Sequence, residues 1–249
     1  MAGNTAQVGA TVTSRALAIF GAFDPAHREL SLSELARRAG LSLTTTHRVV
    51  AELAAWGALE RLAGGDYVVG RRIWDLGHLA PVESGLRETA SPFLHDLYAA
   101  TLATVHLAVR DGYEVLYLDR LAGHASVPVV SQIGSRLPMH ATGVGKVLLA
   151  YAPEPVRVAV FSRLTRITRH TITHPGLLNR QLARVLREGF AQTSEEMSLG
   201  ACSVAVPIRD RCDVVVAALG IVVPDLRRDR PRLVSALQVA AQGVGRSLP

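Results

Sequence analysis

The stretch LSLSELARRAGLSLTTTHRVVAELAAWGAL constrains the fold of this chain more than any other segment. It predicts two short helices, the first capped by Ser33 and ending at Gly40. The second begins near Ser42 or Thr44, which can cap it, and ends at Gly57. Two short helices joined by a glycine turn are typical of a helix-turn-helix.

The flanking segments complete a small domain. Upstream, TSRALAIFGAF places Leu17, Phe20 and Phe23 at helical spacing, which predicts another amphipathic helix. Downstream, LERLAGGDYVVG predicts two strands around a Gly-Gly-Asp turn, a hairpin of the size of a wing. Together they predict a winged helix-turn-helix over residues 12–72, behind a flexible tail at 1–11.

The second of the paired helices begins with side chains that suit DNA. Short hydroxyls and an imidazole can reach base edges in the major groove, while arginines hold phosphates or a guanine. The net charge of +6 favours a polyanion partner. Residues 1–75 carry eight arginines against seven acids, so the prediction depends on the order of elements and not on charge. The alternatives are a plain helical subdomain or a surface for a protein partner. The candidate DNA contacts are Arg15, Ser42, Thr44, Thr45, His47, Arg48 and Arg61.

The segment TGVGKV resembles a phosphate-binding loop but lacks the residues that such a loop needs. A phosphate loop requires glycine where His140 stands and a hydroxyl where Val147 stands. A dinucleotide-binding turn requires a third glycine in place of Leu148. What remains is a helix start after two glycines, with amides that can face an anion or a carbonyl. Lys146, the only lysine of the chain, is expected to face solvent or a dimer partner.

The rest of the chain predicts an α+β domain. Alternating apolar residues predict strands at THLAVRDG, EVLYLDR, SVPVVS, AQTSE, SVAVPIRD and DVVVAALGIVV. Helices are predicted around them, after Gly143 and at PEPVRVAVFSRL, PGLLNRQLARVLREG and DLRRDRPRLVSALQVAAQGVGRSL. An antiparallel sheet flanked by helices follows from this order.

Several of these motifs, in this order, resemble the IclR family of bacterial transcriptional regulators. They are SRALAIF, LSELARRAGLSLTTTHRVVAEL, IWDLG, HLAVRDGYEVLYLDRL, GSRLPMHATGVGKVLLA, TRHTIT and ACSVAVPIRDRCDVVVAALGIVVP. The resemblance runs from about residue 12 to the final helix. It implies a GAF-like or profilin-like sheet at 87–249 that binds a small effector. It also implies a linker helix at 73–86 that carries dimer contacts, although its stripe of Ile73, Leu76 and Leu79 could instead pack on its own domain.

The resemblance implies an effector cavity as well. Thr193 stands where members that bind small carboxylates have an acid, and Gly220 and Val222 stand where they have two serines. We therefore expect a roomier, less polar cavity that takes a partly apolar effector, such as an aromatic or acyl acid. The candidate effector contacts are Val129, Leu137, Met139, Gly143, Val144, Thr193, Ala201, Ser203, Gly220 and Val222.

Catalysis has little support in the sequence. Glu195 and Glu196 are adjacent on a predicted strand, so they point to opposite faces and are expected at a solvated rim. His170 and His174 are four residues apart, but their β-branched surroundings before Pro175 disfavour a helix. Neither H-E-x-x-H nor G-x-S-x-G is present. No catalytic residue, cofactor or metal is expected.

Partners and location follow from the remaining signals. Cys202 and Cys212 fit no metal or disulfide pattern, and the longest apolar run is about half of the roughly 20 residues needed to cross a membrane. We expect a cytoplasmic protein with no membrane partner. The expected partners are a double-stranded DNA operator, the small effector and a second copy, since palindromic operators suit homodimers. The resemblance also implies a homotetramer as a possible assembly. It does not decide whether the protein is a repressor or an activator.

Overall fold

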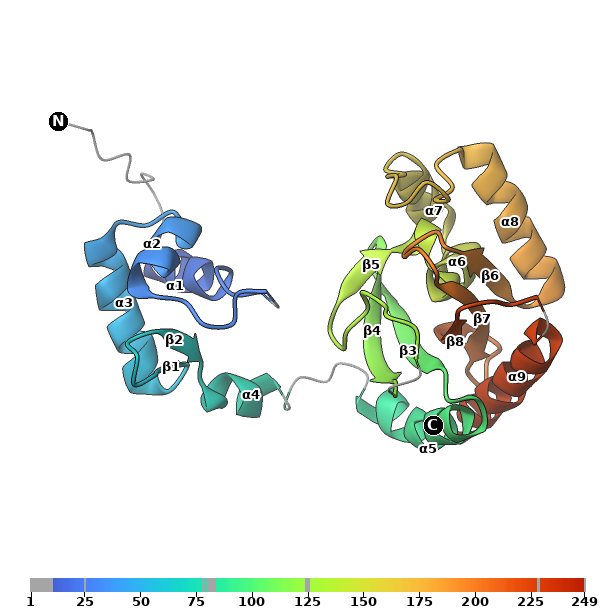
Figure 1. Cartoon of the computed structure of the whole chain (residues 1–249), viewed down its shortest axis with the longest axis horizontal. Helices are drawn as coiled ribbons and strands as arrows, with labels where there is room; N and C mark the ends of the chain where they lie inside the picture. The colour runs from blue at the N-terminus through green and yellow to red at the C-terminus, as the bar shows by residue number, and fades with distance from the viewer. Residues whose placement is uncertain are drawn as a thin grey trace. The chain divides into compact units, whose positions relative to one another are not determined.

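The computed structural model describes residues 11–24, 26–77, 79, 84–123, 126–227 and 229–248. The chain divides into two compact units, Met1–Val82 and Glu83–Pro249 (Figure 1). In the described part of the chain, no helix is both long and apolar enough to cross a membrane. The fold is a two-domain α+β fold, as the sequence predicts.

The first unit is a winged helix-turn-helix. Its elements are α1 (Val12–Phe20), α2 (Leu32–Ala39), α3 (Leu43–Trp56) and the antiparallel pair β1 (Leu59–Arg61) and β2 (Tyr67–Val69). Gly40 and Gly57 end α2 and α3 in the left-handed conformation, which glycine adopts without strain. A single apolar core joins the three helices to the hairpin; it is built around Ile19, Leu30, Leu35, Val49, Val50 and Leu59.

Two local predictions for this unit are wrong. The cap of α2 is Ser31 and not Ser33, because Ser31 accepts a hydrogen bond from the Glu34 amide while the Glu34 carboxylate binds back to Ser31. On α1, Leu17 is 64% exposed and Ile19 is the fully buried residue. Phe20 and Phe23 pack against the core as expected, so only Leu17 of the predicted stripe faces away from it. Of the predicted tail, Thr11 caps α1, and residues 1–10 lie outside the described part.

Two helices lie between this domain and the sheet in sequence. α4 (Arg71–Gly77) buries none of its residues, and α5 (Ser84–Thr101) belongs to the second unit. Leu76 and Leu79 are exposed. Of the predicted stripe, Ile73 in α4 is half-buried. The rest of that segment, residues 78 and 80–83, lies outside the described part.

The second unit is a six-stranded antiparallel sheet between two layers of helices (Figure 1). The strand order is β5-β4-β3-β8-β7-β6. Helices α5 and α9 pack on one face, and α6, α7 and α8 pack on the other. The bounds are β3 (Thr104–Asp111), β4 (Glu114–Leu121), β5 (Arg136–Pro138), β6 (Ala191–Ser194), β7 (Cys202–Arg209), β8 (Val215–Val223), α6 (Gly143–Ala150), α7 (Glu154–Phe161), α8 (Pro175–Glu188) and α9 (Arg230–Ser247), with a 3-10 turn at Met139–Ala141.

The strand predicted at SVPVVS is wrong. Residues 126–131 do not form a strand, and the edge of the sheet beside β4 is instead β5. Pro128 lies in the middle of the segment and has no N–H to donate to a ladder. The segment contributes Val129, Val130 and Ser131 to the wall of a cavity.

Candidate nucleic-acid interface and ligand cavity

The start of α3 presents the polar side chains that were predicted to meet DNA. Thr44, His47 and Arg48 are exposed there. Ser42 caps the helix by accepting a hydrogen bond from the Thr45 amide, and its hydroxyl donates to Thr45 Oγ1 over 2.9 Å. Ser42 and Thr45 thus also hold the helix start, while the other three side chains point away from the core.

The remaining candidate DNA contacts lie on other elements. Arg15 is half-buried on α1, and Arg61 is exposed on β1. The Arg61 guanidinium lies 5.8 Å from the centre of the Tyr67 ring, and its Nε donates to the Gly65 carbonyl over 3.4 Å. Arg61 is therefore held against its own hairpin. Arg48 lies 3.8 Å from Glu52 in an ion pair whose two side chains are both about 60% exposed.

The second unit contains a cavity between the start of α6, the sheet and residues 129–131. Its empty space, including the part open to solvent at the mouth, is about 480 Å³. Nine of the ten predicted effector contacts line it. Met139 does not, because it is fully buried in the core beside α6. The lining is His106, Tyr117, Val129, Val130, Ser131, Leu137, Ala141, Thr142, Gly143, Val144, Thr193, Met197, Ser198, Ala201, Ser203, Val204, Gly220, Ile221 and Val222.

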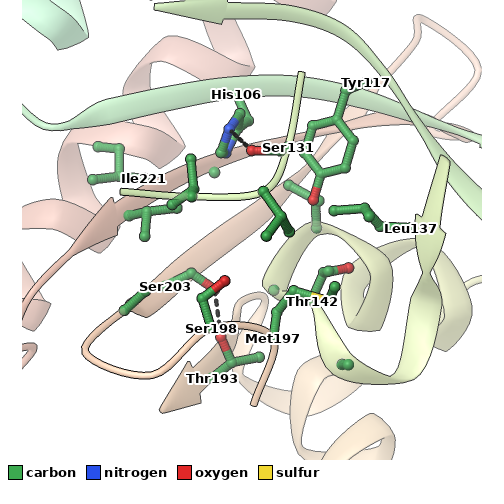
Figure 2. Close-up of a pocket in the computed structure, with 18 of the residues that line it drawn as sticks. His106, Tyr117, Ser131, Leu137, Thr142, Thr193, Met197, Ser198, Ser203 and Ile221 are labelled. Carbon is green, nitrogen blue, oxygen red and sulfur yellow. Dashed lines mark hydrogen bonds between the residues drawn. The ribbon is translucent and has the colours of Figure 1, made fainter. Parts of the chain in front are cut away.

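Two hydrogen-bonded pairs supply polar atoms to the lining, beside the hydroxyls of Tyr117, Thr142 and Ser198. Thr193 Oγ1 and Ser203 Oγ are 2.6 Å apart on neighbouring strands β6 and β7. His106 Nε2 and Ser131 Oγ are 2.7 Å apart, joining β3 to the segment before β5. Figure 2 shows the two pairs on opposite sides of the cavity, with aliphatic side chains between them.

The lining carries no net charge at neutral pH. Burial, with a smaller contribution from nearby Arg120, lowers the pKa of His106 to about 3, so its imidazole is neutral. Burial also raises the pKa of Tyr117 above its ordinary value, against a smaller lowering by a hydrogen bond with Thr142. Among the described residues that line the cavity there is no Asp, Glu, Lys or Arg. A bound anion would therefore rely on hydroxyls and backbone amides.

Two glycines bring α6 close to the sheet. A Cβ built on Gly143 would lie 2.5 Å from Ser203 Oγ, and one on Gly220 would lie 2.8 Å from Val144 Cγ1. The start of α6, capped by Thr142, thus lies directly against the Thr193–Ser203 pair. The space that a serine would take at position 220 is occupied by Val144 and is not open to a ligand.

Comparison with known proteins places the chain in a family. The family model for the IclR helix-turn-helix domain matches residues 12–63, and the one described as "Bacterial transcriptional regulator IclR C-terminal" matches residues 80–246. This chain belongs to the IclR family. It is 32% identical to the HTH-type transcriptional regulator XynR of Escherichia coli K12 over 240 residues, which cover 94% of this chain and 95% of that protein. It is 34% identical to the regulator BhcR of Paracoccus denitrificans over 223 residues, which cover 88% of this chain and 79% of that protein.

Solved structures agree with this assignment. An IclR homologue from Microbacterium hydrocarbonoxydans, complexed with 4-hydroxybenzoate, has a TM-score of 0.90 and 34% identity; the match covers 96% of this chain and 99% of that one. IclR-family proteins are DNA-binding transcriptional regulators, and these relatives are regulators and not enzymes.

One prediction about this IclR-family chain is wrong in an informative way. Lys146 does not face solvent or a dimer partner; its side chain is 1% exposed. Its Nζ lies 2.5 Å from Glu196 Oε1 and donates to Gln181 Oε1 over 2.6 Å. Glu196 is likewise buried and not at a solvated rim. The ion pair ties α6, whose first residues line the cavity, to the segment that supplies Met197 and Ser198 to the same lining.

The other candidate chemical groups do not assemble into a site. Strand β6 ends at Ser194, so Glu195 and Glu196 follow the strand, and Glu195 has a left-handed φ of 54°. Within the described residues, no group of three or more His, Cys, Asp or Glu could hold a metal ion. Cys202 is buried and Cys212 exposed, and neither is in a disulfide.

Sequence reasoning missed several side chains of the cavity in this IclR-family protein, above all His106, Tyr117 and Thr142. Alternation along HLAVRDGYEVLYLD contained a usable signal for the first two. His106 on β3 and Tyr117 on β4 point to the same face of the sheet as Ala108, which pairs with Tyr117. A buried polar residue at an inward position of a strand indicates a role beyond packing. Others missed were Val130, Ser131, Ala141, Met197, Ser198, Val204 and Ile221.

Proposed function

We propose that this IclR-family regulator binds a double-stranded operator and that a partly apolar organic acid, of the aromatic or acyl kind, modulates this binding. The observation that carries the effector class is the cavity. Its lining is neutral and mostly apolar, with a hydroxyl pair beside the start of α6. Amides at a helix start favour an anion, so a single carboxylate can be accommodated there without a cationic side chain. The complex of the Microbacterium homologue with 4-hydroxybenzoate supports the same class.

The rest of the molecule supports the DNA-binding part of the proposal. Residues 12–72 form the DNA-binding domain, residues 73–86 the linker and residues 87–249 the effector domain. The exposed start of α3 enters the major groove, and Arg61 on the wing holds the backbone. The protein acts as a homodimer, since two recognition helices can then read two half-sites about one turn apart. The exposed α4 supports a role of the linker in this dimer.

A thermal-shift screen, followed by a gel shift, tests the proposal. Aromatic and acyl monocarboxylates, including 4-hydroxybenzoate, should raise the melting temperature, whereas two- and three-carbon acids should not. The stabilising acid should then change binding to the upstream region of the neighbouring genes. Binding should fall steeply between two salt concentrations, because contacts to phosphates release counterions. Stabilisation by the two- and three-carbon acids alone would refute the effector class.

A further inference from the structure

The cavity has a second polar end, opposite the Thr193–Ser203 pair, that the proposed effector class does not yet use. It consists of His106 and Ser131, which come from β3 and from the segment 126–131. Both residues line the cavity, and both are nearly fully buried. Figure 2 shows this pair facing the cavity from the side opposite Thr193 and Ser203.

We propose that His106 and Ser131 form a subsite for a neutral hydroxyl on the end of the effector that lies away from its carboxylate. The proposal rests on the proposed function, since it assigns the far end of a ligand whose carboxylate lies at the start of α6. It makes His106 and Ser131 specificity-determining residues for a hydroxylated aromatic acid.

The hydrogen-bonding capacity of the pair matches a hydroxyl. A neutral imidazole has one N–H donor and one acceptor nitrogen, and the serine hydroxyl can rotate to serve either role. Only Nε2 of His106 is engaged with Ser131. A hydroxyl both donates and accepts, so it can join this chain of hydrogen bonds whichever ring nitrogen carries the proton.

A second carboxylate fits this end poorly. It only accepts hydrogen bonds and it is charged, so its burial requires a cation or several donors. Arg120 is the cationic residue whose charge acts on His106, and it lies opposite His106 in the β3–β4 register. Its guanidinium does not line the cavity, and its buried Nε has no partner among the described residues. Arg120 therefore helps to keep His106 neutral without offering its charge to a ligand.

The space between the two ends suits a flat apolar body. Aliphatic side chains line the cavity between the pairs, and Val144 of α6 covers Gly220, which lies opposite His106 on β8. The Tyr117 ring lies 4.9 Å from the His106 ring, edge to face, and borders the same end. An aromatic ring with a carboxylate at one end and a hydroxyl in the para position has this distribution of polar and apolar groups.

Calorimetric titration of the full-length protein tests the subsite with three para-substituted benzoates. They share the carboxylate and differ at the far end: 4-hydroxybenzoate, the isosteric 4-methylbenzoate, and terephthalate with its second carboxylate. Wild type should bind 4-hydroxybenzoate roughly tenfold more tightly than 4-methylbenzoate, as expected when buried polar groups lose their partner. Terephthalate should bind more weakly than either.

Two variants and a matched control test whether His106 and Ser131 cause the preference for 4-hydroxybenzoate over 4-methylbenzoate. Ser131→Ala and, separately, His106→Gln should reduce the preference for the hydroxyl to about threefold or less. Thr193→Val alters the other pair, so it should weaken 4-hydroxybenzoate and 4-methylbenzoate alike and keep their ratio. A purely structural role of the His106–Ser131 bond predicts instead that Ser131→Ala lowers stability and leaves the ratio unchanged.

The outcomes of these titrations distinguish failure of the subsite from failure of the proposed function. If neither 4-hydroxybenzoate nor 4-methylbenzoate binds the wild type, the aromatic effector and the subsite are both overturned. If both bind equally, or if Ser131→Ala and His106→Gln keep the full preference, only the subsite is overturned. Tighter binding of terephthalate would show that this end takes an anion, which contradicts a neutral subsite.

Discussion

The two units use polar side chains in opposite ways. On α3 in the first unit, Arg48 and Glu52 form an ion pair at 3.8 Å with both side chains about 60% exposed. In the second unit, Lys146 and Glu196 form one at 2.5 Å with side chains 1% and 6% exposed. The exposed pair leaves Arg48 available to a partner, whereas the buried pair is committed to the fold. Charge is thus part of the proposed DNA-binding surface, but around the cavity it is structural and the ligand meets neutral groups.

The largest effect expected from this contrast is on stability. Lys146→Met leaves Glu196 buried without its cation, and breaking a buried pair in this way costs about 3–5 kcal/mol. Urea unfolding followed by far-UV circular dichroism measures the loss in the second unit. Both tryptophans, Trp56 and Trp74, lie in the first unit, so their fluorescence should report an unchanged transition.

A control at the exposed pair completes the test. Arg48→Met should leave both transitions in place, because pairs this exposed contribute little. The double variant with Lys146→Met and Glu196→Leu should recover much of the lost stability, since apolar groups of similar volume can replace a buried pair. If Lys146→Met lowers the free energy of unfolding no more than Arg48→Met does, the contrast between the buried and the exposed ion pair is wrong.

The buried pair also shows where sequence reasoning ends. The glycines and the apolar run around Lys146 predicted α6 correctly, because helix signals are local. The partner of Lys146 lies 50 residues further along the chain, and no local pattern indicates that the two meet. The segment 126–131 is a similar case: its β-branched residues predicted a strand, but the fold uses them as a cavity wall. The order of the elements was predictable; the long-range pairing of buried polar groups was not.

The next effect concerns pH, and again it should be confined to the second unit. The pKa of His106 is about 3 in the folded protein and near 6.5 when unfolded, so below pH 6.5 the unfolded chain binds the extra proton. Stability contributed by neutral His106 is therefore lost as pH falls from 6.5 toward 3. Between pH 7 and pH 5 the loss should be about 2 kcal/mol, at roughly 1.36 kcal/mol per pH unit below 6.5.

Urea unfolding at the two pH values checks this, again by circular dichroism against tryptophan fluorescence. His106→Asn should remove most of the pH dependence of the second unit. Burial also lowers the pKa of His140, whose Nε2 lies 2.9 Å from the Thr165 carbonyl oxygen, so His140 acts in the same direction. His140→Asn is the matched control, and this variant should keep the share of the pH dependence that His106 contributes. The same slope in wild type and His106→Asn would mean that His106 is not the group that titrates.

Substitutions at the exposed surface of the first unit are expected to change the affinity for DNA and not the stability of the fold. If Arg48 contacts a base, Arg48→Ala should weaken operator binding by roughly 1–3 kcal/mol and relax the sequence preference at one position. If Arg61 holds a phosphate, Arg61→Ala should weaken binding to all sequences alike and reduce the salt dependence by about one counterion. Gel shifts with the operator and a scrambled sequence at two salt concentrations distinguish the two. Unchanged DNA binding in Arg48→Ala would favour a protein partner for the start of α3.

The smallest expected effect is on the stability of the first unit, where a helix cap and not a buried ion pair holds the start of α2. Ser31 and Glu34 bind each other's backbone at the start of α2, and loss of such a cap costs about 1 kcal/mol. Ser31→Ala should lower the tryptophan-detected stability by that amount. Ser33→Ala, two residues away and exposed, is the matched control and should have almost no effect, although local sequence first suggested Ser33 as the cap. The motif S-x-x-E from Ser31 to Glu34 is a recognised capping box. Equal losses in the two variants would indicate that the reciprocal bonds of Ser31 contribute nothing, and that α2 is held by its apolar face alone.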